Sequence, residues 1–209
     1  MSETENTAER LNALLAEAGQ KPLSPDQTAH FSLYLELLLR WNTRINLTAV
    51  RDEAGILSRH FLECIGCARG LPAGIGTLLD FGSGAGLPGI PIAICRPEIA
   101  VMLAESQGKK AAFLREAVRV LGVSVGVHAG RAETMGAGFD CVTLRAVDKM
   151  EKAVREASRL VKAGGWLALM TTEGDLPRLK AAAVECSTWN TVPLPGSERR
   201  ILALGKMAS

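Results

Sequence analysis

One run, Leu-Leu-Asp-Phe-Gly-Ser-Gly-Ala-Gly-Leu-Pro-Gly at positions 78–89, constrains the fold of this chain more than any other segment. Its apolar start predicts a short buried strand, its glycines predict a tight turn, and the residues that follow predict the start of a helix. Glycine tolerates positive φ angles and lets the backbone approach a ligand, because it has no Cβ. The run therefore predicts a strand–loop–helix unit that binds a small molecule at its loop.

The charge and the prolines of this run indicate which ligand it suits. Its glycines fit G-x-G-x-x-G, a dinucleotide spacing that is weak on its own, but Asp80 precedes the turn and would repel phosphate. Pro88 and Pro91 remove N–H donors that would hold an anion at the helix start. S-adenosylmethionine (SAM) carries positive charge and no phosphate, and D-x-G-x-G-x-G from Asp80 to Gly86 resembles the first motif of SAM-dependent methyltransferases. A turn that only connects strand to helix is the alternative.

Length and composition exclude several classes of protein. A chain of 209 residues, 47% of them hydrophobic, is long enough for one good core with a small appendage. No apolar stretch reaches the roughly eighteen residues of a membrane span, and residues 1–20 are charged throughout, unlike a signal peptide. Cys64 and Cys67 form C-x-x-C without a second pair. We therefore expect a cytoplasmic protein with no metal and no membrane partner.

Residues 1–70 are predicted to form a mostly helical N-terminal segment. Ser24 has the position of an N-cap, with Gln27 completing a capping box, and apolar residues then recur at helical spacing over 31–45. A further helix is expected from Asp52. Because the long apolar face needs a partner, we expect this segment to pack on the domain that follows.

Residues 71–209 alternate between predicted strands and helices. The expected strands are 77–81, 100–104, 124–128, 140–144, 166–170, 188–192 and 201–204. Helical stretches are expected at 91–95, 109–121 and 149–162, with a short turn near 131–135. This order predicts an α/β fold of the Rossmann-like class, a seven-stranded, mostly parallel sheet with helices on both faces. Ligands of such sheets bind beyond the carboxyl ends of the strands.

Three charged residues follow predicted strand ends and are candidates for that site. Glu105 is placed to accept hydrogen bonds from the ribose hydroxyls of an adenosine, and Glu133 suits an adenine amino group. Each is otherwise a solvated loop acid. Arg145 is permanently charged and can orient a cofactor or a base. Its alternative role is an ion pair with Asp80 or Glu133.

The residues around Arg145 narrow the chemistry. No N/D-P-P-Y/F segment occurs, no cysteine ends the strand, since Cys141 lies within it, and the aspartate of a Lys-Asp-Lys-Glu set is missing at this point. These absences disfavour methylation of exocyclic amines, pyrimidine C5 and ribose hydroxyls. N7 of guanine fits, because its in-plane lone pair needs alignment rather than deprotonation.

Two further groups of residues are less specific. Lys109 and Lys110 begin a basic run on the helix after the second strand, which predicts either RNA phosphate contacts or a solvated face. His60 falls on the apolar stripe of its helix, so we expect a hydrogen-bonded core histidine.

Several segments together resemble the bacterial RsmG (GidB) methyltransferases, which methylate N7 of one guanine in 16S rRNA. The segments occur in this order: Trp41-Asn42, Asn46-Leu47-Thr48-Ala49, Arg59-His60-Phe61-Leu62, 80–91, Gly108-Lys109-Lys110, Phe113-Leu114 and Arg145-Ala146. The resemblance implies a SAM-type sheet with an N-terminal helical segment (1–70 and 71–209). It also implies SAM contacts at Gly82, Leu87, Ala132, Glu133 and Arg145. The chain departs from the family at Met170-Thr171, where many members carry a lysine.

The sequence thus predicts an rRNA (guanine-N7)-methyltransferase whose partner is 16S rRNA or the small ribosomal subunit, with no obligate protein partner evident. A SAM-dependent enzyme for another RNA or a small molecule, and a nicotinamide-binding oxidoreductase or sensor, are the alternatives. Arg145 is the predicted catalytic residue, in an orienting role without a general base, and Lys109 and Lys110 are predicted to bind RNA. The predicted cofactor-binding residues are Asp80, Gly82, Gly84, Leu87, Glu105, Ser106, Ala132, Glu133 and Arg145.

Overall fold

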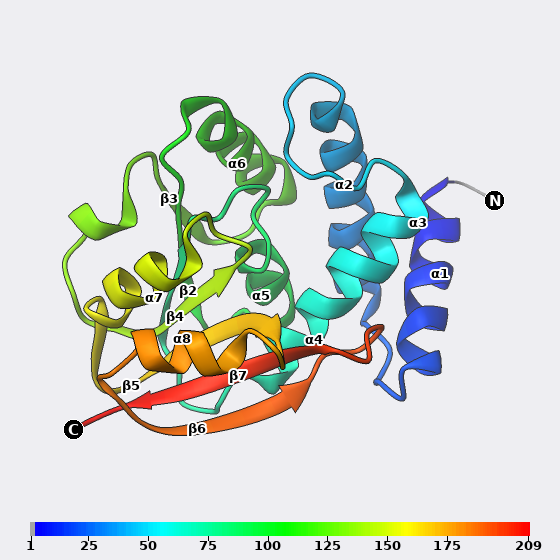
Figure 1. Cartoon of the computed structure of the whole chain (residues 1–209). Helices are drawn as coiled ribbons and strands as arrows, with labels where there is room; N and C mark the ends of the chain where they lie inside the picture. The colour runs from blue at the N-terminus through cyan, green and yellow to red at the C-terminus, as the bar shows by residue number, and fades with distance from the viewer. Residues whose placement is uncertain (1–2) are drawn as a thin grey trace.

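The computed structural model describes residues 3–209, with side chains from Thr7 onward. Its centre is a seven-stranded sheet in the order β3-β2-β1-β4-β5-β7-β6 (Figure 1). Strands β3, β2, β1, β4 and β5 pair in parallel, whereas β7 runs antiparallel to both β5 and β6. The chain order reverses between β1 and β4, which leaves an open edge beyond their carboxyl ends.

All seven predicted strands are present, and the predicted α/β class is confirmed. They are β1 Thr77–Phe81, β2 Ala100–Ala104, β3 Val125–His128, β4 Phe139–Arg145, β5 Val161–Thr172, β6 Cys186–Pro193 and β7 Arg200–Met207. The helix predicted over 149–162 is too long, because α7 ends at Ser158 and β5 begins at Val161. Val161 pairs with Phe139 of β4, so strand pairing takes the end of the predicted helix.

The helices flank this sheet. They are α1 Glu3–Glu17, α2 Pro25–Asn42, α3 Glu53–Gly55, α4 Leu62–Gly70, α5 Gly89–Cys95, α6 Gly108–Leu121, α7 Met150–Ser158 and α8 Leu176–Ala182, with a π-helical turn η1 Ile56–Phe61 and a 3-10 turn η2 Ala132–Thr134. The predicted capping box of Ser24 and Gln27 is confirmed. Helix α8 was not predicted. No helix between residues 3 and 209 is long and apolar enough to cross a bilayer.

Each face of the sheet carries its own core, because neighbouring strand residues point to opposite faces. Leu78 belongs to the core that contains residues of α1, α2, α4, α5 and α6, whereas Leu79 belongs to the core beneath α7 and α8. Both side chains are fully buried. Strands that are covered on both faces are continuously apolar, which is why β1 and β2 were recognisable in the sequence.

The N-terminal helices share the first of these cores with the sheet. Phe31 and Tyr34 of α2 pack on Phe61 of η1, with ring centroids 5.0 and 5.2 Å apart. All three side chains are fully buried in the cluster that also contains Leu78 of β1. The helical segment therefore lies close to the loop that follows β1.

Candidate functional site

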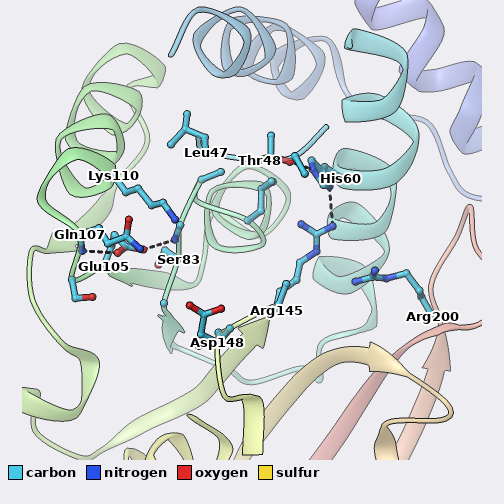
Figure 2. Close-up of a pocket in the computed structure, with 18 residues that line it drawn as sticks. Leu47, Thr48, His60, Ser83, Glu105, Gln107, Lys110, Arg145, Asp148 and Arg200 are labelled. Atoms are coloured by element: carbon cyan, nitrogen blue, oxygen red, sulfur yellow. Dashed lines mark hydrogen bonds between the residues drawn. The ribbon is translucent and has the colours of Figure 1, made fainter. Parts of the chain in front are cut away.

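The carboxyl ends of β1, β2 and β4 border a cavity of about 490 Å³ beside the glycine-rich loop, and we call it the glycine-loop cavity. Lys110 of α6 reaches it from one side and His60 of η1 from the other (Figure 2). The predicted residues that line it are Gly82, Gly84, Leu87, Glu105, Ser106, Lys110 and Arg145. Residues from separate parts of the chain therefore converge where the sequence placed the ligand.

Glu105 holds the glycine-rich loop through its carboxylate. Its Oε2 accepts a hydrogen bond from the N–H of Gly84 at 2.9 Å, and its Oε1 accepts one from the N–H of Gln107 at 2.7 Å. The side chain is buried but lines the cavity. A carboxylate has about four lone-pair sites, so two remain for a ligand. The loop donor at Gly84 is at the same time unavailable to a phosphate.

Asp80 lies elsewhere than the sequence suggested. The prediction placed this carboxylate in the ligand site, but it lies beneath the loop, only 1% exposed, and it does not line the cavity. Its oxygens accept hydrogen bonds from the N–H of Gly89 and the hydroxyl of Thr143, each at 3.1 Å. Burial raises the pKa of Asp80 to about 6, against the lowering effect of these hydrogen bonds. Asp80 therefore shapes the loop from below.

Two glycines of the loop serve different purposes. Gly84 has a φ of +56°, and a Cβ built on it would meet only the carbonyl oxygen of Gly82, at 3.9 Å. Gly86 has a φ of +82°, but a Cβ there would lie 2.6 Å from Ile90. Gly84 thus leaves open space on the cavity side, and Gly86 allows the loop to pack against its own helix.

Helix α2 also holds the loop, which sequence analysis did not foresee. The hydroxyl of Tyr34 donates a hydrogen bond to the carbonyl oxygen of Ala85 at 2.5 Å. Burial raises the pKa of Tyr34 well above its ordinary value, so the hydroxyl keeps its proton. The N-terminal segment is thereby bonded directly to the loop.

Arg145 ends β4 as predicted, and its side chain is only 9% exposed. Its Nη2 donates hydrogen bonds to Oε2 of Glu63 and to the carbonyl oxygen of Arg59, both at 3.1 Å. The alternative ion pair with Asp80 or Glu133 is wrong, because the carboxylate at Arg145 belongs to α4 of the N-terminal segment. Glu63 also lies 3.2 Å from Nε of Arg200, so one buried acid holds two arginines.

His60 is a neutral hydrogen-bonding link in this cluster. Its Nδ1 lies 2.9 Å from Nη2 of Arg145, and its Nε2 lies 2.6 Å from the hydroxyl of Thr48. Arginine only donates, so this contact requires the tautomer with the ring proton on Nε2, and the three acceptors around Nη2 share its two N–H groups. Burial, with the nearby Arg145 guanidinium, lowers the pKa of His60 to about 4. The predicted hydrogen bonding is present, although the ring is half-buried and reaches the cavity.

Ala132 and Glu133 line an adjoining cavity of about 320 Å³ instead of the first one. The two cavities share Gly82, Ser106, Val147 and Asp148. An elongated ligand that crosses the end of β1 can therefore reach both, with Glu133 at its far end. Of the two predicted lysines, Lys110 lines the first cavity, while Lys109 is exposed outside it.

Several residues at the site escaped sequence reasoning. Asp148 lies three positions after Arg145 and contributes a second carboxylate to the cavity lining, a position that the strand-end rule could have found. Glu63 is a charged residue on a buried helix, which is a recognisable signal for an ion pair. Thr48 lies in the Asn46-Leu47-Thr48-Ala49 segment that carries the family resemblance, but no role was predicted for it or for Arg200.

Comparisons with known proteins agree with this geometry. The model of the family GidB, rRNA small subunit methyltransferase G, matches residues 27–195. A protein of Chloroflexus aggregans named ribosomal RNA small subunit methyltransferase G is 37% identical over 217 aligned residues, covering 96% of this chain and 90% of that protein. A protein of the same name from Roseiflexus sp. is 47% identical over 135 residues, covering 61% of this chain and 58% of that protein.

A solved structure shows the same fold at lower similarity. The 16S rRNA N2 G1207 methyltransferase (RsmC) of T. thermophilus, in complex with AdoMet and guanosine, superposes with a TM-score of 0.55 at 17% identity. The match covers 71% of this chain and 39% of that chain.

Proposed function

We propose that this chain transfers a methyl group from SAM to N7 of a guanine in 16S rRNA. The chain belongs to the rRNA small subunit methyltransferase G (GidB) family. Membership favours a methyltransferase over the nicotinamide-binding alternative. We infer that the substrate is the rRNA or the small subunit that contains it, and that the enzyme works in the cytoplasm.

The residues of the two adjoining cavities fit SAM. Gly84 leaves open space in the cavity lining, and the loop N–H groups of Gly84 and Gly89 are bonded to carboxylates, which disfavours a phosphate ligand. When bound, SAM supplies a methyl group on a positively charged sulfur. We propose that Glu105 and Ser106 bind its ribose, and that Ala132 and Glu133 bind its adenine.

The remaining cofactor residues act on the loop side. We propose that Gly82, Gly84 and Leu87 contact SAM, whereas Asp80 supports the loop from below without touching the cofactor. Arg145, on the opposite wall, orients the reacting pair. Lys109 and Lys110 are proposed to contact RNA phosphates at the cavity rim.

The observation that carries the choice of N7 is the hydrogen bond between Arg145 and His60. It occupies the one unprotonated ring nitrogen of His60, whose pKa of about 4 makes the ring a weak base. Arg145 itself does not titrate. Guanine N7 has a lone pair and no proton, so these residues need only align it with the methyl group.

The direct test is methylation of 16S rRNA isolated from cells that lack the gene. We expect one guanine to become sensitive to borohydride reduction and aniline cleavage, which report N7-methylguanine. A methyl group on an exocyclic amine or a ribose hydroxyl would contradict the choice of N7. Absence of any methylation of both free rRNA and isolated subunits would contradict the proposed function itself.

The pH dependence tests the absence of a base. Glu105, Asp148, His60 and Lys110 are the titratable groups that line the glycine-loop cavity. We expect the single-turnover rate at saturating SAM and RNA to be nearly flat across neutral pH, in the wild type and in Asp148→Asn alike. A rate that rises about tenfold per pH unit would instead indicate a general base. Loss of that slope in Asp148→Asn would identify Asp148 as the base.

A further inference from the structure

A third cavity, of about 690 Å³, adjoins the glycine-loop cavity on the side away from Glu133, and four arginines line it. Arg51 comes from the loop after α2, Arg59 from η1, Arg145 from the end of β4 and Arg200 from the start of β7. We call it the arginine cavity. Figure 2 shows that Arg145 and Arg200 both extend toward the helix that carries His60. Ala49, His60, Arg145 and Arg200 line both cavities, so they form the wall between them.

The arginine cavity has an excess of positive charge. Its acids are Asp52 and Glu63. Glu63 is already within ion-pair distance of Arg145 and Arg200, and Oδ1 of Asp52 accepts a hydrogen bond from the N–H of Gly55. Among the side chains that the structure describes, no acid forms an ion pair with Arg51 or Arg59. Nη2 of Arg51 donates one hydrogen bond to Oδ1 of Asn46 at 3.0 Å, so the other N–H groups of Arg51 and the guanidinium of Arg59 remain available to an anion.

The wall of this cavity also contains unsatisfied donors. Nε of Arg145 and Nε of Arg200 are buried and have no hydrogen-bond acceptor among the described residues. Nε of Arg200 lies 3.2 Å from Glu63 but outside hydrogen-bonding geometry. Buried donors are nearly always paired in native proteins, and leaving one unpaired costs free energy. These unpaired donors add to the positive character of the wall, which favours an anion in the cavity.

We propose that the arginine cavity binds a phosphodiester group of the RNA strand, next to the nucleotide whose base enters the glycine-loop cavity. This inference rests on the proposed function. RNA-modifying enzymes reach a base only after it leaves the stack, and the backbone on either side must then be held. Arginine forks match phosphate oxygens in a bidentate geometry that lysine does not provide. The shared wall places phosphate and base in neighbouring compartments.

The test compares RNA binding by Arg59→Ala and by the double variant Arg51→Ala/Arg59→Ala with the wild type. Both side chains are exposed, and the carbonyl of Arg59 that binds Arg145 is retained. We expect the Kd for 16S rRNA to rise about fivefold per arginine at low salt, and the slope of log Kd against log salt to fall by about one per arginine. The Kd for SAM should stay unchanged, because neither Arg51 nor Arg59 lines the glycine-loop cavity.

Arg155→Ala is the matched control, because Arg155 is exposed on α7 and lines neither cavity. If the double variant keeps the wild-type Kd and salt slope, as the control should, the inference is wrong. Inorganic phosphate is titrated separately, and the melting temperature of the wild type is measured. If phosphate raises that melting temperature while the double variant binds RNA like the wild type, the cavity holds a free phosphate and the inference is wrong. In either case wild-type methylation of 16S rRNA would leave the proposed function intact.

Discussion

The glycine-loop cavity and the arginine cavity lie on two sides of the same wall, yet they are stabilised differently. In the first, the carboxylates of Glu105 and Asp80 accept hydrogen bonds from backbone N–H groups of the loop. In the second, Arg51 and Arg59 project from the surface without ion pairs among the described side chains. The loop is therefore fixed before a ligand arrives, whereas Arg51, which donates to Asn46, and Arg59 gain anionic partners only on binding. Substitutions in the glycine-rich loop should accordingly abolish SAM binding, whereas each substitution in the arginine cavity should weaken RNA binding by one further step.

Removing residues 1–70 should have the largest effect, because it destroys the walls of both cavities. It removes Phe31, Tyr34 and Phe61 from the core that contains Leu78 of β1, together with the bond that holds Ala85. We propose that the two parts fold as one unit and expect fragment 71–209 to lose its cooperative thermal transition, which circular dichroism would report. A soluble fragment that melts cooperatively and binds SAM normally would show instead that the segment is an independent module.

Gly84→Val should abolish SAM binding while leaving RNA binding unchanged. The valine would fill the open space of the cavity lining and strain a backbone with a φ of +56°. Calorimetry would measure the SAM affinity, and the melting temperature would confirm folding. Gly136→Val is the control, because a Cβ there meets nothing within 4 Å and the φ is not positive.

If valine disturbs the loop itself, the SAM affinity of the smaller Gly84→Ala variant is measured instead. Wild-type SAM affinity in a folded Gly84→Val protein would mean that this glycine does not border the cofactor. A simultaneous loss of RNA affinity would contradict the expectation that Gly84 affects the cofactor alone.

Arg145→Ala should lower the single-turnover rate by about two powers of ten or more, because Arg145 belongs to both cavities and aligns the reacting pair. Arg145→Lys should restore little, since a point charge does not replace a planar fork. Arg200 still pairs with Glu63 in both variants, so we expect them to fold. Activity near the wild-type level in the alanine variant would reduce Arg145 to a structural ion pair with Glu63.

The sequence was most informative where structure is local. Strands 77–81 and 100–104 were predicted to the residue, because buried parallel strands are continuous apolar runs between glycine and polar residues. Glu105 and Arg145 were found because they follow such strands, and topology brings strand ends together. Helix α8 was missed because it is short, with Pro177 in its first turn.

The sequence was least informative where partners lie far apart along the chain. Tyr34 and Ala85 are separated by 51 positions, and Arg145 and Glu63 by 82. Neither pair leaves a pattern in spacing, since only the packing of the helical segment on the sheet brings them together. Asp80 was misplaced for the same reason, because its partner Thr143 lies 63 positions away on β4.

The smallest effect concerns the pH dependence of the free energy of unfolding, to which Asp80 and His60 should contribute with opposite signs. Asp80, beneath the glycine-rich loop, has its pKa raised from 3.8 to about 6, so the stability that its neutral form contributes is lost as pH rises from about 4 to 6. His60, at the arginine cavity, has its pKa lowered from 6.5 to about 4, so its contribution is lost as pH falls through the same range. Each shift corresponds to at most about 3 kcal/mol, and less for the half-buried His60.

The free energy of unfolding of the wild type, measured in urea, should therefore change little between pH 4.5 and 6.5. His60→Gln keeps only the Asp80 contribution and should become less stable as pH rises through this range. Asp80→Asn keeps only the His60 contribution and should become more stable as pH rises. Parallel curves for all three proteins would contradict the opposed shifts.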